Sequence, residues 1–452
     1  MATTSFSASI STPDDTLAAP VNMRPFLTIW TGQLISMLGS GLTSFALGVW
    51  IFQQTGRVTP FALTVLFGSL PRILLLPLAG SLADRWNRRW MMFLADTGSA
   101  LTTLAVVLLL AFGSLQIGHI YLLVILSSFF AAFQEPSYSA SVTMLVPKKN
   151  LGRANGLLQL SQALETIATP LIAGVLFVAI DLRGILMIDF VTYFAALAAL
   201  LIVRIPQPKV EQAAGETKSS VWKDFSFGWS YLRCRPGLFG LLLYYAMVNF
   251  LLNLSGVLMG PLVLSNHSAS VFGTVQTTAG VGMLLGSIVI SAWGGPKGRR
   301  IPSVIGYIAV SILGLIIAGL GINPLFPIAG YLVLLFFVPL ASGSSQAVFQ
   351  TKVAPQVQGR VFSVRSMLSR SMMPLAFLLS GPLADRVFEP LMRQGGPLAS
   401  TVIASTLGLG PGRGIGLLFI VCGLLALLAS LLAYLNPRIR NLEIELPDGI
   451  PD

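Results

Sequence analysis

The sequence predicts an all-α polytopic membrane protein, with twelve transmembrane helices in two pseudo-repeated six-helix bundles. Of its 452 residues, 54% are hydrophobic and 10% are charged, whereas soluble domains carry about 25% charged residues. Apolar runs long enough to cross a bilayer core of about 30 Å recur along the whole chain. The basic residues behind the net charge of +11 lie mostly between these runs. They therefore indicate orientation in a membrane rather than binding to nucleic acid.

Twelve apolar runs are expected to form the membrane helices, because each is long enough to span the bilayer. In chain order they are residues 25–52, 60–82, 90–112, 119–145, 155–180, 184–203, 237–264, 270–294, 301–321, 325–350, 360–388 and 411–435. This order predicts a tail (1–24), an N-terminal six-helix bundle (25–203), a linker with an amphipathic helix (204–236), a C-terminal six-helix bundle (237–435) and a second tail (436–452).

The distribution of basic residues predicts that both tails and the linker are cytoplasmic. With twelve spans, twenty Lys and Arg residues fall on the side of the two tails, five on the other side, and three inside the runs. Short cytoplasmic segments carry such an excess of positive charge. The first 22 residues are polar, so no cleaved signal peptide is expected. We expect a multi-pass protein of the bacterial inner membrane.

The linker contains a stretch with the spacing of an amphipathic helix. Trp222, Phe225, Trp229 and Leu232 recur at steps of three and four residues, with charged residues on the other faces. This pattern is typical of a helix that lies in the membrane interface. A linker that merely carries aromatic anchors remains the alternative.

An internal repeat supports two related halves. Gly80-Ser81 with Arg88-Arg89 is echoed by Gly286-Ser287 with Arg299-Arg300. Likewise, Gly152-Arg153 and Gly174 recur at Gly359-Arg360 and Gly381, a shift of 207 residues. Parallel repeats of this kind build many transporters.

Several classes of protein are excluded by the residues that are missing. The sequence contains no phosphate-binding loop, no His-Glu-x-x-His and no Gly-x-Ser-x-Gly. Its two cysteines, Cys234 and Cys422, are far apart in the chain and imply no disulfide framework. We therefore expect no enzyme activity, no cofactor and no metal. The expected partners are a small-molecule substrate, protons and the lipid bilayer, with no nucleic acid, and the chain is expected to be a monomer.

Four charged residues fall near the middle of predicted spans, about 15 Å from a helix end at 1.5 Å per residue. They are Arg72, Glu135, Glu165 and Arg370. Ionisable residues inside a membrane are costly and often functional. We predict that Glu135 or Glu165 couples transport to protons or binds a cationic substrate. The alternative is an internal ion pair of either glutamate with Arg72, and a structural role for Arg370.

The loop at residues 80–89, Gly-Ser-Leu-Ala-Asp-Arg-Trp-Asn-Arg-Arg, resembles the signature loop between helices 2 and 3 of the major facilitator superfamily. That loop reads Gly-x-Leu-Ala-Asp-Arg-x-Gly-Arg-Arg. Asn87 replaces its second glycine, and asparagine also tolerates a left-handed turn. The resemblance assigns a gating role to five residues, which are Gly80, Asp84, Arg85, Arg88 and Arg89.

In this superfamily the signature aspartate closes the cytoplasmic side by meeting the N-terminus of helix 11. The partner of Asp84 would thus lie around Gly359 to Phe362, where the helix dipole favours a carboxylate. Helices 3 and 6 are peripheral in the superfamily, so structural pairing is expected for Asp96 and Asp189. For Asp385, at the outer end of helix 11, an outer gate and a simple helix terminus both remain open.

The resemblance also implies that the first helix of each three-helix unit lines a central cavity. Spacings of three and four residues place the polar side chains of each such helix on one face. The candidates are Gln33, Ser36, Ser40 and Thr43, then Ser127, Gln134, Glu135 and Tyr138, then Tyr245, Asn249 and Asn253, and finally Ser342, Gln346 and Gln350. Interhelical hydrogen bonds that only hold the bundle together are the alternative.

Further segments resemble the macrolide-efflux branch of drug:proton antiporters. They are Val146-Pro147, Arg153-Ala-Asn155-Gly156, Phe362, Gly381-Pro-Leu-Ala-Asp385 and Glu389-Pro390. The branch implies export of a bulky, partly apolar compound in exchange for protons. Two features depart from related antiporters, because helix 4 lacks an arginine and the helix-5 motif is reduced to Thr166-x2-Thr169-Pro170-x3-Gly174. A siderophore or lysophospholipid transporter, a metabolite importer and a non-transporting scaffold are the alternatives.

Overall fold

Within the described residues, which are 22–147, 150–205, 221–296, 298–353 and 355–447, every regular element is a helix in the computed structural model. The elements are α1 (Arg24–Thr55), α2 (Val58–Arg85), α3 (Arg88–Ala111), α4 (Ile117–Leu145), α5 (Leu151–Ile202), α6 (Val221–Arg233), α7 (Pro236–Leu264), α8 (Ala269–Trp293), α9 (Arg300–Leu320), α10 (Leu325–Lys352), α11 (Pro355–Pro382), η2 (Leu383–Phe388), α12 (Glu389–Leu391), α13 (Val402–Leu407), α14 (Arg413–Leu435), α15 (Pro437–Arg440) and α16 (Leu442–Glu445).

These helices supply twelve spans, which confirms the predicted fold class. Ten described helices are long and apolar enough to cross a membrane. One of them, α5, is two helices joined at Asp181, whose φ of 56° and ψ of −177° reverse the chain. Such a positive φ is uncommon outside glycine. The remaining span is α11, which continues through the π-helical turn η2.

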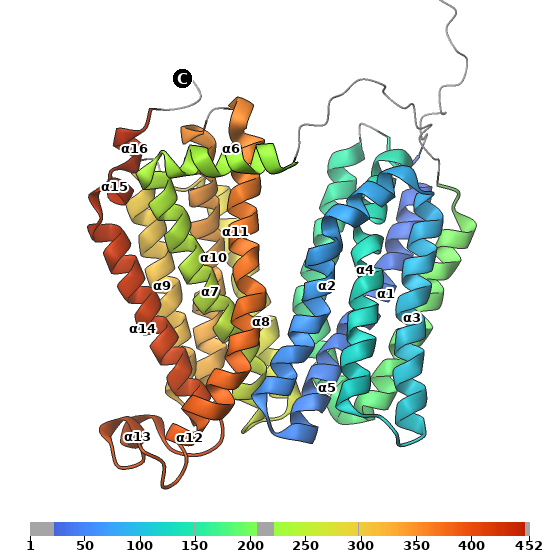
Figure 1. Ribbon diagram of the computed structural model, residues 1–452. Coiled ribbons are helices and arrows are strands. Elements are labelled where there is room, and N and C mark those ends of the chain that lie inside the picture. The colour runs from blue at the N-terminus through green and yellow to red at the C-terminus, as the bar shows by residue number, and fades with distance from the viewer. Residues whose placement is uncertain (1–21, 148–149, 206–220, 297, 354, 448–452) are drawn as a thin grey trace, which may run out of the picture.

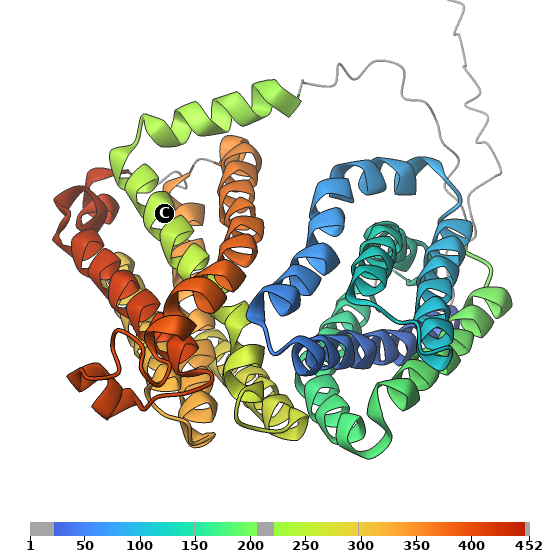
Figure 2. The same cartoon turned by 60° about the horizontal axis from the view of Figure 1, so that its bottom comes forward.

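The spans form two bundles that meet at one end and diverge at the other (Figure 1). Helices α1 to α5 build the N-terminal bundle, and α7 to α14 build the C-terminal bundle. We call the end that carries α6 and α16 the linker face, and the end that carries α12 and α13 the opposite face. The bundles separate towards the linker face and close on each other at the opposite face (Figures 1 and 2).

Small residues allow α5 and α8 to pack closely where the bundles meet. A Cβ atom on Gly273 of α8 would lie 2.2 Å from the carbonyl oxygen of Pro170, and one on Gly174 of α5 would lie 2.7 Å from that of Ala269. Glycine at such positions lets two membrane helices approach through their backbones. Figure 2 shows these two helices side by side.

The amphipathic helix predicted in the linker corresponds to α6, which lies across the linker face of the C-terminal bundle (Figure 1). Leu232 is fully buried. The ring of Trp229 packs edge-on against Phe239 of α7, with centroids 5.7 Å apart. The helix also contacts α11. The side chains of Trp222 and Phe225 lie outside the described residues.

The described part of the C-terminal segment is anchored to the C-terminal bundle. The Nζ atom of Lys352 donates to the carbonyl oxygens of Glu443 and Leu446, at 2.7 Å each. The carboxylate of Glu443 accepts a hydrogen bond from the backbone N–H of Ile301 at 2.9 Å, at the start of α9. A carboxylate at a helix N-terminus is favourable. These bonds tie residues 442–446 to α9 and α10.

Replacement of Gly286 tests the close packing inside the C-terminal bundle. A Cβ atom there would lie 2.0 Å from the carbonyl oxygen of Phe336 in α10, a backbone atom that cannot rotate away. We expect Gly286→Ala to cost about 1–3 kcal/mol, the typical penalty for overpacking. The midpoint of thermal unfolding in detergent should fall accordingly.

Gly306 is the matched control, because a Cβ atom there would meet nothing within 4 Å. Gly306→Ala should leave stability unchanged or raise it by about 0.5–1 kcal/mol, since alanine favours a helix. Equal unfolding midpoints for the two variants would contradict the packing argument.

Candidate functional site

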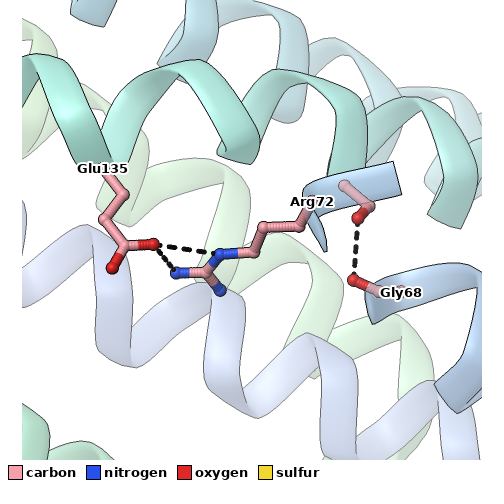
Figure 3. Close-up of polar contacts among 4 residues, drawn as sticks. Gly68, Arg72 and Glu135 are labelled. Atoms are coloured by element: carbon pink, nitrogen blue, oxygen red, sulfur yellow. Dashed lines mark hydrogen bonds and ion pairs between the residues drawn. The ribbon is translucent and has the colours of Figure 1, made fainter. Parts of the chain in front are cut away.

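An ion pair joins α2 and α4 in the middle of the N-terminal bundle (Figure 3). Nη2 of Arg72 lies 2.5 Å from Oε2 of Glu135, and Nε donates to the same oxygen at 3.1 Å. Each of the two side chains is 51% exposed. Nearby, the Ser128 hydroxyl donates to the carbonyl oxygen of Gly68 at 2.7 Å. This bond holds α2 and α4 together one turn of α2 from Arg72.

Arg72 also interacts with a second carboxylate. Glu165, on α5, is half-buried and attracts the Arg72 guanidinium electrostatically. Arg72 therefore forms an ion pair with Glu135 of α4 and lies within electrostatic range of Glu165 of α5. With both glutamates ionised, the three residues together carry one excess negative charge. The structure thus brings together three of the four charged residues that the sequence analysis selected.

Other polar residues of the N-terminal bundle bond to one another. Nε2 of Gln134 donates to Oε1 of Gln33 at 2.6 Å, and Nε2 of Gln33 donates to Asp96 at 2.8 Å. This chain links α4, α1 and α3. Asp189 accepts from Ser40 at 3.1 Å and from Thr103 at 3.0 Å. Both aspartates thus pair within the bundle, as expected for peripheral helices.

Several of the other cavity candidates are half-buried. Among them are Ser36 of α1 and Tyr138 of α4. In α7, the Tyr245 hydroxyl donates to the carbonyl oxygen of Ala341 at 3.2 Å, and Asn253 donates to the carbonyl oxygen of Asn249 at 2.7 Å. The side chain of Arg370 lies outside the described residues.

Arg365 is a functional candidate that sequence reasoning overlooked. Its Nη1 donates to Oε1 of Gln346 at 2.8 Å, and its Nη2 donates to the hydroxyl of Ser345 at 3.3 Å. Its guanidinium carbon lies 4.3 Å from the ring centroid of Phe349. Arg365 is charged and falls inside a predicted span, which is the signal that selected Arg370. Its partners on α10 are seen only in the folded structure.

The signature loop anchors α3 to the end of α5. Arg89 donates to the carbonyl oxygens of Leu200 at 2.6 Å and Leu201 at 2.9 Å, which are among the last carbonyls of α5. Asn87 is extended, with φ of −65° and ψ of 110°, and its side chain accepts from the N–H groups of Arg89 and Trp90. The expected left-handed turn is therefore wrong. Asparagine is accommodated here because it caps α3.

The other residues of the signature loop are only partly described. Arg88 is buried and has interactions of its own. The side chains of Asp84, Arg85 and Arg360 lie outside the described residues, and so do the surroundings of Gly80 and Gly359. The contact expected between Asp84 and helix 11 therefore stays a prediction.

Asp385 joins the two bundles at the opposite face. Its carboxylate accepts hydrogen bonds from the backbone N–H of Val58 at 2.9 Å, the N–H of Thr59 at 2.8 Å and the hydroxyl of Thr59 at 2.6 Å. Val58 and Thr59 are the first residues of α2, whose free N–H groups and dipole favour an anion. Asp385, at the end of α11, thus caps a helix of the other bundle.

Comparison with known proteins agrees with this architecture. Residues 29–387 match the sequence model of the Major Facilitator Superfamily. The chain belongs to this superfamily. Members of the Major Facilitator Superfamily are transporters, so the expectation that this chain is not an enzyme is confirmed.

Two curated relatives in the Major Facilitator Superfamily are named as efflux proteins. Macrolide efflux protein A of Streptococcus pyogenes is 28% identical over 377 residues, which cover 80% of this chain and 90% of the relative. The multidrug efflux pump Tap of Mycolicibacterium fortuitum is 23% identical over 432 residues, which cover 93% of this chain and 97% of the relative.

Solved structures of the superfamily show the same fold at low identity. A bacterial homolog to the human lysosomal transporter Spinster, inward-facing and unoccupied, gives a TM-score of 0.67 at 15% identity, covering 93% of this chain and 98% of that one. The nucleoside transporter NupG gives a TM-score of 0.60 at 13% identity, covering 92% of this chain and 100% of that one.

Substitution of Asp385 tests whether its cap holds the opposite face closed. Hydrogen bonds to a charged group contribute about 1.5–3 kcal/mol. We therefore expect Asp385→Asn to raise the fraction of molecules with separated bundles by about tenfold or more. Double electron–electron resonance between two spin labels would measure the separation of the bundles. The labels would be attached at Gln54 and Ser268, which are both exposed at this face, in a Cys234→Ser background.

Arg386→Gln is the matched control, because this substitution changes the charge one residue away from Asp385. The Arg386 side chain is exposed and makes no described contact with α2. Its distance distribution should equal that of the parent protein. An unchanged distribution for Asp385→Asn would show that the cap does not hold the bundles together.

Proposed function

We propose that this protein is a secondary active transporter that exports a bulky, partly apolar, drug-like compound by alternating access in exchange for protons. The Arg72–Glu135 ion pair, with Glu165 within electrostatic range of Arg72, carries the proposal. The names of its relatives, macrolide efflux protein A and the multidrug efflux pump Tap, support the class of substrate.

The exposure of the Arg72–Glu135 pair supports its contact with the space between the bundles. Both side chains are half-exposed near the middle of membrane helices. Exposure of charged groups to lipid is costly, and such residues usually face the bundle interior or a water-filled cavity. In this arrangement water and substrate from the linker face would reach both carboxylates.

Proton coupling follows from competition for Arg72. Protonation of either glutamate neutralises the excess negative charge of the three-residue group and leaves the other glutamate to pair with Arg72. A cationic group on the substrate would compete for the same carboxylates, so the proton and this end of the substrate would not be bound together. Mutually exclusive binding is the requirement for antiport, because each ligand biases the conformational equilibrium through its own contacts.

The observed cap at the opposite face and a second cap that we propose for the linker face together suggest alternating access. Asp385 caps α2 where the bundles are closed. Asp84, at the other end of α2, is proposed to cap α11 when the linker face closes. The basic residues near the linker face favour a cytoplasmic position for it. The present state is then open to the cytoplasm, and both termini are cytoplasmic in a monomer of the inner membrane.

Accumulation of a fluorescent drug substitute in cells tests this function. Cells that express the protein should accumulate less ethidium than control cells, and a protonophore should abolish the difference. Glu135→Gln or Glu165→Gln should raise accumulation close to the level of cells without the protein, because the coupling carboxylate is lost.

Glu445→Gln provides the control for a simple change of charge, since the Glu445 side chain is exposed at the linker face and makes no described contact. This variant should export normally. Export that continues in the presence of the protonophore, or in both glutamate variants, would contradict proton coupling through this group.

A further inference from the structure

A second charged group lies in the C-terminal bundle. Arg365 comes ten residues after Pro355, the first residue of α11, and therefore about 15 Å along the helix axis from the linker face. Glu135 lies ten residues before the end of α4, at about the same depth. The two bundles thus each present a charged group at one level of the membrane.

Residues from two other helices surround the Arg365 guanidinium. Gln346 and Ser345 accept its hydrogen bonds from α10. The ring centroid of Phe349, also from α10, lies 4.3 Å from the guanidinium carbon, and that of Tyr245, from α7, lies 5.9 Å away. These partners hold the planar group in one orientation, since aromatic faces and neutral oxygens both attract a cation.

The guanidinium lacks an anionic partner among the described residues. Both of its described hydrogen-bond acceptors are neutral oxygens. An arginine has five N–H donors, and the bonds to Gln346 and Ser345 use two of them. A cation away from bulk water gains most from a carboxylate or phosphate that accepts two parallel N–H bonds. Glu135, by contrast, is already paired with Arg72 in the other bundle.

We propose that Arg365 binds the carboxylate of the transported compound, with Gln346 and Ser345 as positioning residues and Phe349 as a flat apolar support. The site would select amphiphilic compounds that combine an aromatic or ring framework with an acidic group. This inference rests on the proposed transport function, and it adds the chemistry of one end of the substrate.

The arrangement explains why neutral partners surround the arginine. A glutamate beside it would neutralise the charge and compete with the substrate. Glutamine and serine orient the N–H groups without cancelling the charge. An arginine held in this way is pre-organised, which lowers the entropy that is lost on binding.

Two dyes that differ only in one carboxyl group test the proposal. Rhodamine B carries a free carboxylate, and its ethyl ester does not. Fluorescence anisotropy measures the affinity of each dye for the purified protein in detergent. The wild type should bind rhodamine B more tightly than the ester. Arg365→Gln should weaken rhodamine B binding by about tenfold or more, because a charged hydrogen bond is lost. Ester binding should change little.

Three further variants separate recognition from folding. Arg365→Lys should retain part of the preference, since it keeps the charge and loses the planar fork. Gln346→Leu should reduce the preference for rhodamine B over its ester, because the Arg365 guanidinium loses the hydrogen bond that orients it. Arg386→Gln, far along the chain from α10, should leave both affinities unchanged. The ratio of the two affinities does not depend on the amount of folded protein, so partial misfolding cannot imitate the result.

The outcome is decided by that ratio. Equal weakening of both dyes by Arg365→Gln, or a wild type without preference for the free acid, would overturn the carboxylate site. Failure of proton-driven export in cells would instead contradict the proposed function, because dye binding in detergent is measured without transport.

Discussion

The free-energy cost of placing a charge in hydrocarbon organises the interior of this protein. The Arg72–Glu135 pair and the Asp96–Gln33–Gln134 chain each connect different helices of the N-terminal bundle through ionised or polar groups. A membrane helix can carry such groups only if a neighbouring helix or a water-filled space receives them. The polar pairs therefore determine which helix faces meet. The apolar faces pack against lipid or against one another without comparable selectivity.

The same cost distinguishes the two bundles. In the N-terminal bundle one arginine interacts with two carboxylates, so charge is nearly compensated within the protein. In the C-terminal bundle Arg365 rests on neutral oxygens and aromatic rings. We propose the first group as the site for a proton and the second as the site for an anionic group, at a similar depth in the membrane.

The contact between the bundles combines packing with helix capping. Gly174 and Gly273 let α5 and α8 approach through their backbones, and Asp385 caps α2 across the interface. Backbone packing is short-ranged and depends closely on shape, whereas a carboxylate at a helix N-terminus is attracted over a longer distance. The bundles are thus joined by backbone packing and by a single anionic helix cap.

The sequence by itself determined the number of spans, their approximate ends and the family. These properties follow from apolar run length, charge distribution and a ten-residue motif, all of which are local in the chain. It also selected Arg72, Glu135 and Glu165 as candidate site residues, because an ionisable residue within an apolar run is conspicuous. The gap between the predicted spans 155–180 and 184–203 placed a connection at residues 181–183, whereas the positive φ by which Asp181 makes that turn is seen only in the folded backbone.

Only the tertiary structure decided which polar residues meet. For Gln33 and Gln134 the sequence left open whether they line a cavity or join helices; in the structure they bond to each other, and Gln33 also bonds to Asp96. Arg365 and Asp385 were visible as charges, but their partners come from other helices. Helical periodicity places a residue on a face, whereas the rotation and crossing of neighbouring helices decide what that face contacts. Those angles depend on packing between residues far apart in the chain, which local sequence patterns do not contain.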